Sequence, residues 1–338
     1  MKSMQCATMV KLYKFSGAGN DFVVLDGRGR DMAPYRAVDQ VRALCRQHHT
    51  DGMMILGEGC SFELPASHSE QSEGISCDFS MEFYNPDGSG GMMCGNGGRC
   101  IVAFADMLGL KPASADGTWL FRAPDGLHKA MILQGPESSE VSKPVATLGR
   151  VRGRGPQSVP EGDDEVGGVA KRRFGDLTAL RTWIVRLKMI DVQGIEPMMG
   201  GYFLNTGTRH FVKFVADVNA VDMEREAKPL RWDPVFQPEG TNVNFVQVTP
   251  DGLYVRTFEK GVEGETLACG TGLTASALAA YRHGILDSFG AEQPRGAGIS
   301  YRLQCRRGDW LQVEFHPEPG DRFTEVYLTG PAECVAVL

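Results

Sequence analysis

Two copies of the pattern Cys-Gly-x-Gly are the residues in this sequence that are best suited to chemistry. The first copy is Cys94-Gly95-Asn96-Gly97, and the second is Cys269-Gly270-Thr271-Gly272. Each copy follows a strand candidate that contains an aromatic residue near its end and opens a helix candidate, so the sequence carries a weak internal duplication. Two related halves that face each other would place Cys94 and Cys269 in equivalent positions on either side of one site.

Such an arrangement could invert a stereocentre. A cysteine at the start of a helix feels unsatisfied backbone amides and the positive end of the helix dipole, and both favour its thiolate. The glycines that follow leave room for a carboxylate to reach the same amides. One thiolate could remove a proton from the neighbouring carbon while the opposite thiol supplies another. Because the α-proton of an amino acid is very weakly acidic, preorganised donors on the carboxylate are also needed.

Two simpler interpretations stay open from the residues alone. A single Cys-Gly-x-Gly is most often a tight turn from strand to helix with a buried cysteine, since free cysteine behaves as a small hydrophobe. Because the pattern occurs twice, the interpretation as a turn with a buried cysteine is less favourable. A redox disulfide between Cys94 and Cys269 also requires proximity, but it gives no reason for the glycines at both helix starts. The nine cysteines include no Cys-x-x-Cys pair, so the sequence predicts neither a disulfide scaffold nor a metal site.

The composition is that of a soluble globular protein about two domains long. The chain has 338 residues, of which 42% are hydrophobic and 23% charged, and its formal net charge is −7. This balance provides no basic field for nucleic acid. No apolar run reaches the ~18–20 residues that span a bilayer, and residues 1–10 lack the apolar core of a signal peptide. We therefore expect a cytoplasmic protein with no nucleic-acid partner and no membrane association.

Predicted strands and helices alternate along the chain, which indicates a mixed α/β or α+β fold. Helices are expected at 37–48, 95–110 and 270–286, and strands at 10–15, 22–26, 53–56, 81–84, 183–189, 202–204, 211–215, 243–248, 253–258, 299–303, 310–315, 324–328 and 333–337. Two polar stretches, 65–77 and 135–180, have the composition of insertions. Basic clusters in the second stretch lie among acidic residues, which favours a solvated loop over a surface for an anionic partner.

Four segments closely resemble the motifs of the diaminopimelate epimerase family, whose members are amino-acid epimerases without a cofactor. They are 14–22 (KFSGAGNDF), 85–100 (NPDGSGGMMCGNGGRC), 240–245 (GTNVNF) and 259–272 (EKGVEGETLACGTG). The resemblance covers nearly the whole chain apart from the two insertions. It implies two pseudo-symmetric α/β domains, each a curved mixed sheet around a central helix, with the active site in the cleft between them. The implied boundaries are 1–135 for the N-terminal domain, 136–180 for an insertion or linker and 181–330 for the C-terminal domain, with a last strand near 331–338 returning to the first.

The resemblance also implies a role for each matching residue. Cys94 and Cys269 would be the two acid/base thiols. The reacting carboxylate would be bound through the helix-start residues Gly95, Asn96, Gly270 and Thr271, with Asn20 near the reacting centre. The distal end of a small amino-acid substrate would be held by Asn85, Asn242, Glu259 and Lys260. The implied activity is the interconversion of LL- and meso-diaminopimelate in lysine biosynthesis, by a homodimer that needs neither cofactor nor metal.

Two departures from the family pattern concern the distal end of the substrate. Before His210 the family usually has Asn and Pro, where this chain has Thr208 and Arg209. At Lys260 the family usually has Arg, and lysine loses the planar fork that grips a carboxylate bidentately. Thr208, Arg209 and His210 are therefore possible substrate contacts, although His210 could equally be a packing residue. Another epimerase or racemase that works without pyridoxal phosphate is the alternative function, and a non-catalytic thiol redox or binding protein is the alternative from another class.

Overall fold

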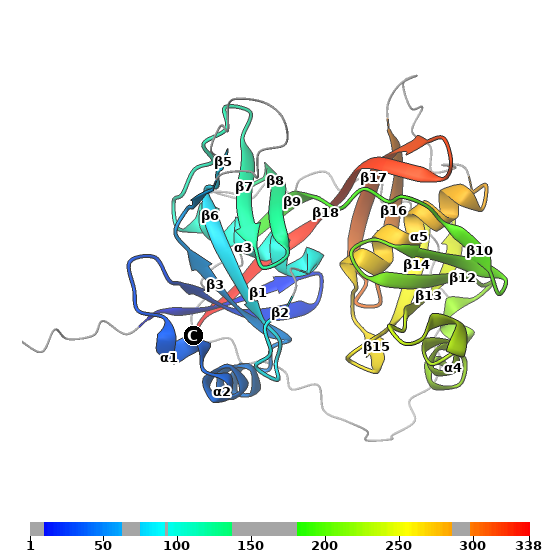
Figure 1. Cartoon of the computed structure of the whole chain (residues 1–338), viewed down its shortest axis with the longest axis horizontal. Helices are drawn as coiled ribbons and strands as arrows, with labels where there is room; N and C mark the ends of the chain where they lie inside the picture. Colours follow the sequence, from blue (N-terminus) through cyan, green and yellow to red (C-terminus); the bar gives the residue numbers. More distant parts are fainter. Residues whose placement is uncertain (1–9, 63–74, 92–93, 137–180, 286–297) are drawn as a thin grey trace, which may run out of the picture.

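The structure is a computed structural model that describes residues 10–62, 75–91, 94–136, 181–285 and 298–338. Sixteen of the described strands form one large sheet that curls around two central helices, one in each half of the molecule, and two short strands pair separately (Figure 1). The predicted insertions at 65–77 and 136–180 lie mostly outside the described residues. The C-terminus lies in the first half, where the backbone of Leu338 donates a hydrogen bond to Leu12 at 2.9 Å.

The first half is a ring of strands around one helix. Its elements are β1 (Leu12–Gly17), β2 (Asn20–Asp26), α1 (Ala33–Arg36), α2 (Val38–His48), β3 (Gly52–Gly57), β4 (Ser61–Phe62), β5 (Ile75–Ser76), β6 (Phe79–Tyr84), α3 (Gly95–Met107), β7 (Thr118–Ala123), β8 (Gly126–Gln134), β9 (Arg181–Lys188) and, from the end of the chain, β18 (Arg322–Val337). Hydrogen bonding runs in the order β1-β2-β3-β6-β7-β8-β9-β18, and β18 pairs with β1 to close the ring.

The second half repeats this arrangement with β18 as a shared strand. Its other elements are β10 (Glu196–Met198), β11 (Gly201–Asn205), β12 (Arg209–Phe214), η1 (Val218–Ala220), η2 (Met223–Ala227), α4 (Lys228–Arg231), η3 (Pro234–Phe236), β13 (Asn242–Thr249), β14 (Gly252–Glu259), β15 (Gly264–Thr266), α5 (Gly270–Arg282), β16 (Ile299–Gln304) and β17 (Trp310–Glu318). The order is β18-β17-β16-β14-β13-β12-β11-β10, with β15 paired to β14. An isolated bridge joins Phe323 of β18 to Val192, which lies four residues before β10.

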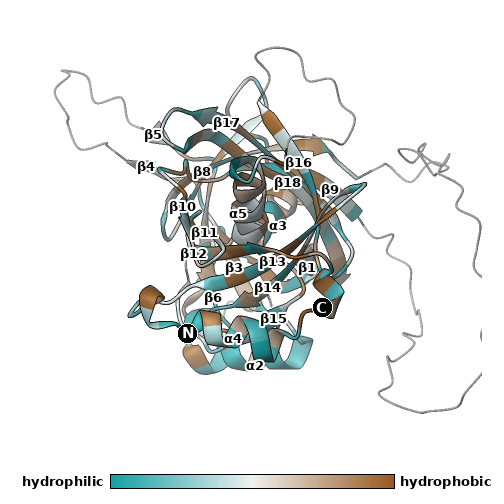
Figure 2. Ribbon diagram, turned by 90° about the vertical axis from the view of Figure 1, so that its right-hand side faces the viewer, coloured by the Kyte–Doolittle hydropathy of each residue, from teal (hydrophilic) through white to brown (hydrophobic). Residues whose placement is uncertain are grey.

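The two central helices carry the core of the molecule. Eleven of the 13 residues of α3 and ten of the 13 residues of α5 are buried, as expected for a helix surrounded by apolar neighbours on all sides. Figure 2 shows α5 and α3 inside the strands, whereas α2 and α4 lie outside and are mostly hydrophilic. The predicted fold class, a mixed sheet curved around a central helix in each half, is confirmed.

One strand joins the halves. Along β18, Thr329 pairs with β17, Gly330 pairs with β9, and Glu333 pairs with β1. Strand β9 lies in the first ring although it follows residue 180 in the sequence, and the side chain of Trp183 donates a hydrogen bond to Asp106 of α3 at 3.0 Å. The division into domains at 135 and 180 stays a prediction.

Replacing Trp183 should destabilise the first ring. The Trp183 side chain is fully buried and packs near Phe15, with ring centroids 6.0 Å apart. We expect Trp183→Ala to lower the free energy of unfolding by about 3–5 kcal/mol, through the cavity and the lost hydrogen bond. Trp232→Ala is the matched control, because Trp232 is 54% exposed and its loss should cost less than about 1 kcal/mol. Equal costs in denaturant titrations would contradict the assignment of Trp183 to the core.

Candidate active site

The starts of α3 and α5 are in contact at two glycines. A Cβ atom added to Gly270 would lie 3.5 Å from the Cα of Gly95 and 3.0 Å from a methyl carbon of Leu328. A Cβ atom added to Gly95 would lie 3.8 Å from the Cα of Gly270. Side chains at these positions would therefore crowd the junction. The N-cap residues of the two helices are Cys94 and Cys269, so the duplicated motif brings its cysteines to one place from both halves.

Both cysteines are free thiols whose pKa is raised by burial. The Sγ of Cys94 accepts a hydrogen bond from the amide of Gly97 at 3.1 Å. Burial nevertheless raises the pKa of Cys94 to about 11, since it outweighs this amide and the nearby charge of Arg99. Burial also raises the pKa of Cys269, and the carboxylate of Glu259 raises the pKa of both thiols. The helix-start amides thus lower the pKa of both thiols as expected, but in the unliganded site burial raises it by more.

Asn96 connects the two halves beside the helix junction. Its Nδ2 donates to the side-chain oxygen of Asn20 and to the carbonyl of Ala268, the latter at 3.3 Å. Its Oδ1 accepts from the guanidinium of Arg99 at 2.9 Å. Arg99 is fully buried and also donates to the carbonyl of Gly95 at 3.2 Å. The Asn96 carboxamide is therefore fixed in orientation, and it holds Asn20 against the residue that precedes Cys269.

A second group of predicted residues meets at the start of β12 and the end of β14. The buried Asn242 donates to the carbonyl of Arg209 at 2.9 Å and to the hydroxyl of Thr208 at 3.3 Å. It accepts from the backbone amide of Lys260 at 2.8 Å. Asn242 therefore fixes the backbone at both positions where the chain departs from the family pattern. Next to them, Glu259 is half-buried, and burial raises the pKa of its carboxyl group.

His210 is a buried, neutral part of a hydrogen-bond chain that leads to Cys269. Asn244 donates to Nδ1 of His210 at 3.0 Å, which leaves the proton of the neutral ring on Nε2. Nε2 lies 2.9 Å from the hydroxyl of Thr208 and 3.0 Å from that of Thr271. The Thr271 hydroxyl is in turn 3.4 Å from the Sγ of Cys269. Burial lowers the pKa of His210 to about 3, so this ring positions the two threonines and carries no charge near neutral pH.

Three predicted residues make their contacts elsewhere. Arg209 points to the face of β12 opposite His210, where it pairs with Glu239 at 2.7 Å and lies over the ring of Phe203. The ammonium of Lys260 donates to the backbone carbonyl of Glu239 at 2.6 Å. The amide of Asn85 donates to Ser89 within its own turn at 2.9 Å. None of these side chains contacts the helix junction in the described part of the structure.

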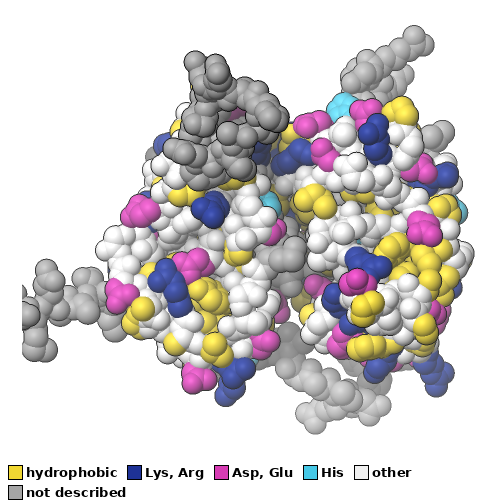
Figure 3. Space-filling view, in the orientation of Figure 1, with side chains coloured by type: hydrophobic (Ala, Val, Ile, Leu, Met, Phe, Trp, Pro, Cys, Tyr) yellow, Lys and Arg dark blue, Asp and Glu magenta, His cyan; other side chains and the backbone are white. Residues whose placement is uncertain are grey.

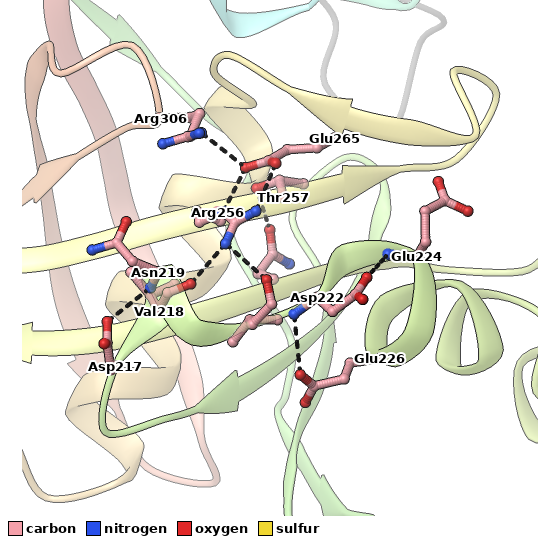
Figure 4. Close-up of polar contacts among 12 residues, drawn as sticks. Asp217, Val218, Asn219, Asp222, Glu224, Glu226, Arg256, Thr257, Glu265 and Arg306 are labelled. Atoms are coloured by element: carbon pink, nitrogen blue, oxygen red, sulfur yellow. Dashed lines mark hydrogen bonds and ion pairs between the residues drawn. The ribbon is translucent and has the colours of Figure 1, made fainter. Parts of the chain in front are cut away.

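A buried ion pair holds the segment that leads to Cys269, and sequence reasoning missed it. Arg256 of β14 donates to both carboxylate oxygens of Glu265 of β15, at 2.6 and 2.8 Å (Figure 4). The same guanidinium donates to the carbonyls of Val218 and Val221, and Arg306 lies 3.4 Å from Glu265 on the other side. The only available signal was an arginine and a glutamate on strands that turn back on each other. Glu265 thereby fixes β15 four residues before the thiol.

Two further expectations concern absences. In the described part of the chain, no three His, Cys, Asp or Glu side chains are grouped so that they could hold a metal ion. No helix among the described residues is long and apolar enough to cross a membrane. That the site works without metal and without cofactor stays a prediction.

Glu259 should slow the reaction of both thiols with an alkylating agent. Its negative charge raises the pKa of Cys94 and Cys269, so Glu259→Gln should lower both pKa values and increase the thiolate fraction at pH 8. We expect iodoacetamide to modify each cysteine about two- to fivefold faster in this variant, as followed by mass spectrometry of the two peptides. Glu318→Gln, at the far end of β17, should react like the unchanged protein. Unchanged or slower alkylation in Glu259→Gln would contradict this account of the thiols.

Known proteins of one family are similar to this chain over nearly its whole length. The sequence model of the family described as diaminopimelate epimerase matches residues 202–298. The chain is 32% identical to the diaminopimelate epimerase of Flavobacterium psychrophilum, over 96% of this chain and 98% of the relative. It is 33% identical to that of Aquifex aeolicus, over 95% of this chain and 94% of the relative.

Two solved structures share the fold at low sequence identity. A PhzF-family phenazine biosynthesis protein from Bacillus anthracis superposes with a TM-score of 0.60 at 10% identity, over 97% of this chain and 98% of the other. A probable proline racemase from Agrobacterium radiobacter gives 0.54 at 14% identity, over 98% and 92%. These likenesses concern the fold alone. Because the curated relatives match over nearly their full length at more than 30% identity, the chain belongs to the diaminopimelate epimerase family.

Proposed function

We propose that this protein inverts one α-carbon of diaminopimelate, converting the LL form to the meso form in lysine biosynthesis. The observation that carries the proposal is the contact between two cysteine-capped helix starts, at glycines from opposite halves of the molecule. The relatives named above are diaminopimelate epimerases, and they support the choice of substrate.

The helix junction fits the binding of one carboxylate. The first amides of α3 and α5 have no partner within their own helices, and both helix dipoles direct their positive ends to the same point. A carboxylate placed there accepts hydrogen bonds from Gly95 and Asn96 on one side and from Gly270 and Thr271 on the other. This polarisation stabilises the electron pair that remains on the substrate when the α-proton leaves.

The two thiols then exchange protons with opposite faces of the α-carbon. The thiolate on one side takes the α-proton and becomes a thiol, while the electron pair of the C–H bond is delocalised into the carboxylate. The thiol on the other side gives its proton to the carbon and is left as the thiolate. One C–H bond breaks and one forms, so the configuration inverts with no net redox change and no leaving group. Cys94 and Cys269 exchange roles when the opposite isomer is the substrate.

Glu259 and Asn242 are placed to hold the distal end of the substrate. Glu259 lies near enough to both thiols to raise their pKa, and its carboxylate is suited to a substrate ammonium group. Asn242 fixes the backbone at Arg209 and Lys260. Asn85 and Lys260 belong to the same proposal, although in the unliganded protein their side chains contact Ser89 and Glu239.

One observation favours a second candidate, an epimerase of the same type that acts on another amino acid. Both cations at the departing positions, Arg209 and Lys260, contact Glu239. A distal carboxylate would have to displace these contacts or use other donors. A substrate without a distal carboxylate would leave Glu239 undisturbed.

The setting of the enzyme is also a proposal. We propose a cytoplasmic homodimer that takes a small amino acid as its partner and binds neither nucleic acid nor membrane. The net charge of −7 supports the first exclusion. In the space-filling view, positive and negative side chains are interspersed over the face that it shows, and no broad basic patch is seen among the described residues on that face (Figure 3).

Isotope exchange tests the function directly. We expect the purified, reduced protein in D2O to incorporate deuterium at the α-carbon of LL-diaminopimelate and to form the meso isomer, as followed by NMR. Incorporation only into another amino acid would replace the proposed substrate by the second candidate. Absence of exchange with every amino acid tested would leave a thiol redox or binding protein.

Loss of either thiol should stop turnover. We expect Cys94→Ala and Cys269→Ala each to lower kcat by at least about 10³-fold, because inversion needs one group on each face of the α-carbon. Cys45→Ala is the matched control, since Cys45 is buried in α2, in an apolar cluster separate from that of the two central helices. Near-normal turnover in either test variant would refute the assignment of two bases.

A further inference from the structure

Arg307 lies on the turn between β16 and β17, in the second half, and reaches into the first half. Its guanidinium Nη1 donates to the hydroxyl of Ser16 of β1 at 3.1 Å, and Nη2 lies 3.6 Å from the carboxylate of Glu333 of β18. Ser16 and Glu333 are paired residues in the register of these two strands. The guanidinium therefore sits over the place where the first ring closes.

The same residue also contacts both segments that carry site residues. Its backbone amide donates to the carbonyl of Leu267 at 3.2 Å, two residues before Cys269. Its side chain covers Gly19, the residue before Asn20: a Cβ atom added to Gly19 would lie 2.8 Å from the Cδ of Arg307 and 3.2 Å from the Cβ of Leu267. The turn at Gly19, with a φ of +97°, is thus packed directly against Arg307 and Leu267.

Arg307 complements the contact that Asn96 makes at the helix junction. Asn96 joins Asn20 to Ala268 from the buried side. Arg307 joins Gly19 to Leu267 from the side exposed to solvent, where its own side chain is 37% exposed. The segment with Asn20 and the segment with Cys269 are consequently held together at two neighbouring points, by residues from opposite halves.

We propose that Arg307 is a positioning residue, which keeps the loop of Asn20 and the loop of Cys269 in register for proton transfer. The proposal rests on the proposed function, because it assigns Arg307 to the geometry of that reaction. Nothing in it requires Arg307 to touch the substrate. Misplacing a reacting group by about 1 Å can cost up to about 100-fold in rate, so a tether two residues from the thiol is a sensitive point.

The test compares Arg307→Gln with Arg302→Gln, a control on the neighbouring strand β16. Arg302 is exposed and lies over the ring of Trp310, away from both loops. Arg307→Gln removes the guanidinium contacts with Ser16 and Glu333 that hold this turn against the first half. We therefore expect faster amide hydrogen exchange in 16–20 and, because the loosened turn is bonded to Leu267, in 264–269. We also expect kcat for α-proton exchange to fall about tenfold, with a smaller change in KM. Arg307→Lys keeps the charge but loses the planar fork, so its kcat and its exchange rates should lie between those of Arg307→Gln and the unchanged protein.

Each outcome decides the proposal. Faster exchange in both segments together with a lower kcat supports it. The proposal is overturned if amide hydrogen exchange in Arg307→Gln changes only within 305–309 or not at all. It is also overturned if kcat of Arg307→Gln equals that of Arg302→Gln. Hydrogen exchange needs no substrate, so it tests the tether even if no amino acid is turned over. In that case the proposed function fails while the tether itself is still measured.

Discussion

The two central helices each begin with a glycine, and the contact between these two glycines is the constraint on which the rest of the molecule depends. Gly95 and Gly270 approach so closely that a Cβ atom on either would touch the other glycine and crowd Leu328. In this fold both helices run through the middle of their halves and begin at this contact. Each helix is then buried on nearly all sides and surrounded by strands, as α3 and α5 are. The two rings of strands provide this burial.

The contact also requires that the two halves keep a fixed position relative to each other, and a shared strand provides this. Backbone hydrogen bonds tie β18 to β17 in the second half and to β9 and β1 in the first. The link is therefore a continuous ladder and not a flexible tether. Finer adjustment comes from side chains that cross between the halves, among which are Asn96 and Arg307. Neither half contains a complete site, because each supplies one thiol and one helix start.

How much of this could be predicted from the sequence depends on the range of the interaction. The helices at 38–48, 95–107 and 270–282 follow from local periodicity and glycine-rich starts, and the duplicated motif pointed to both thiols. The Arg256–Glu265 pair and the reach of Arg307 depend on tertiary neighbours that no local pattern specifies. Arg209 shows the same limit. Its position in the motif is that of a substrate contact, but strand alternation turns its side chain to the opposite face of β12 from His210.

The raised pKa of the two thiols describes the unliganded site, and the proposed reaction needs this pKa to fall toward the working pH when the substrate binds. A base that removes a proton from a very weak carbon acid works better the higher its own pKa, although less of it is then present in the charged form. With a pKa of about 11 for Cys94, the unliganded protein holds few thiolates at neutral pH, and these cysteines are poor targets for alkylation and oxidation. Each thiolate that does form is a strong base beside preorganised amides. In the proposed reaction, the substrate ammonium would offset the charge of Glu259, which is one of the groups that raise the pKa of the thiols, so binding would increase the thiolate fraction.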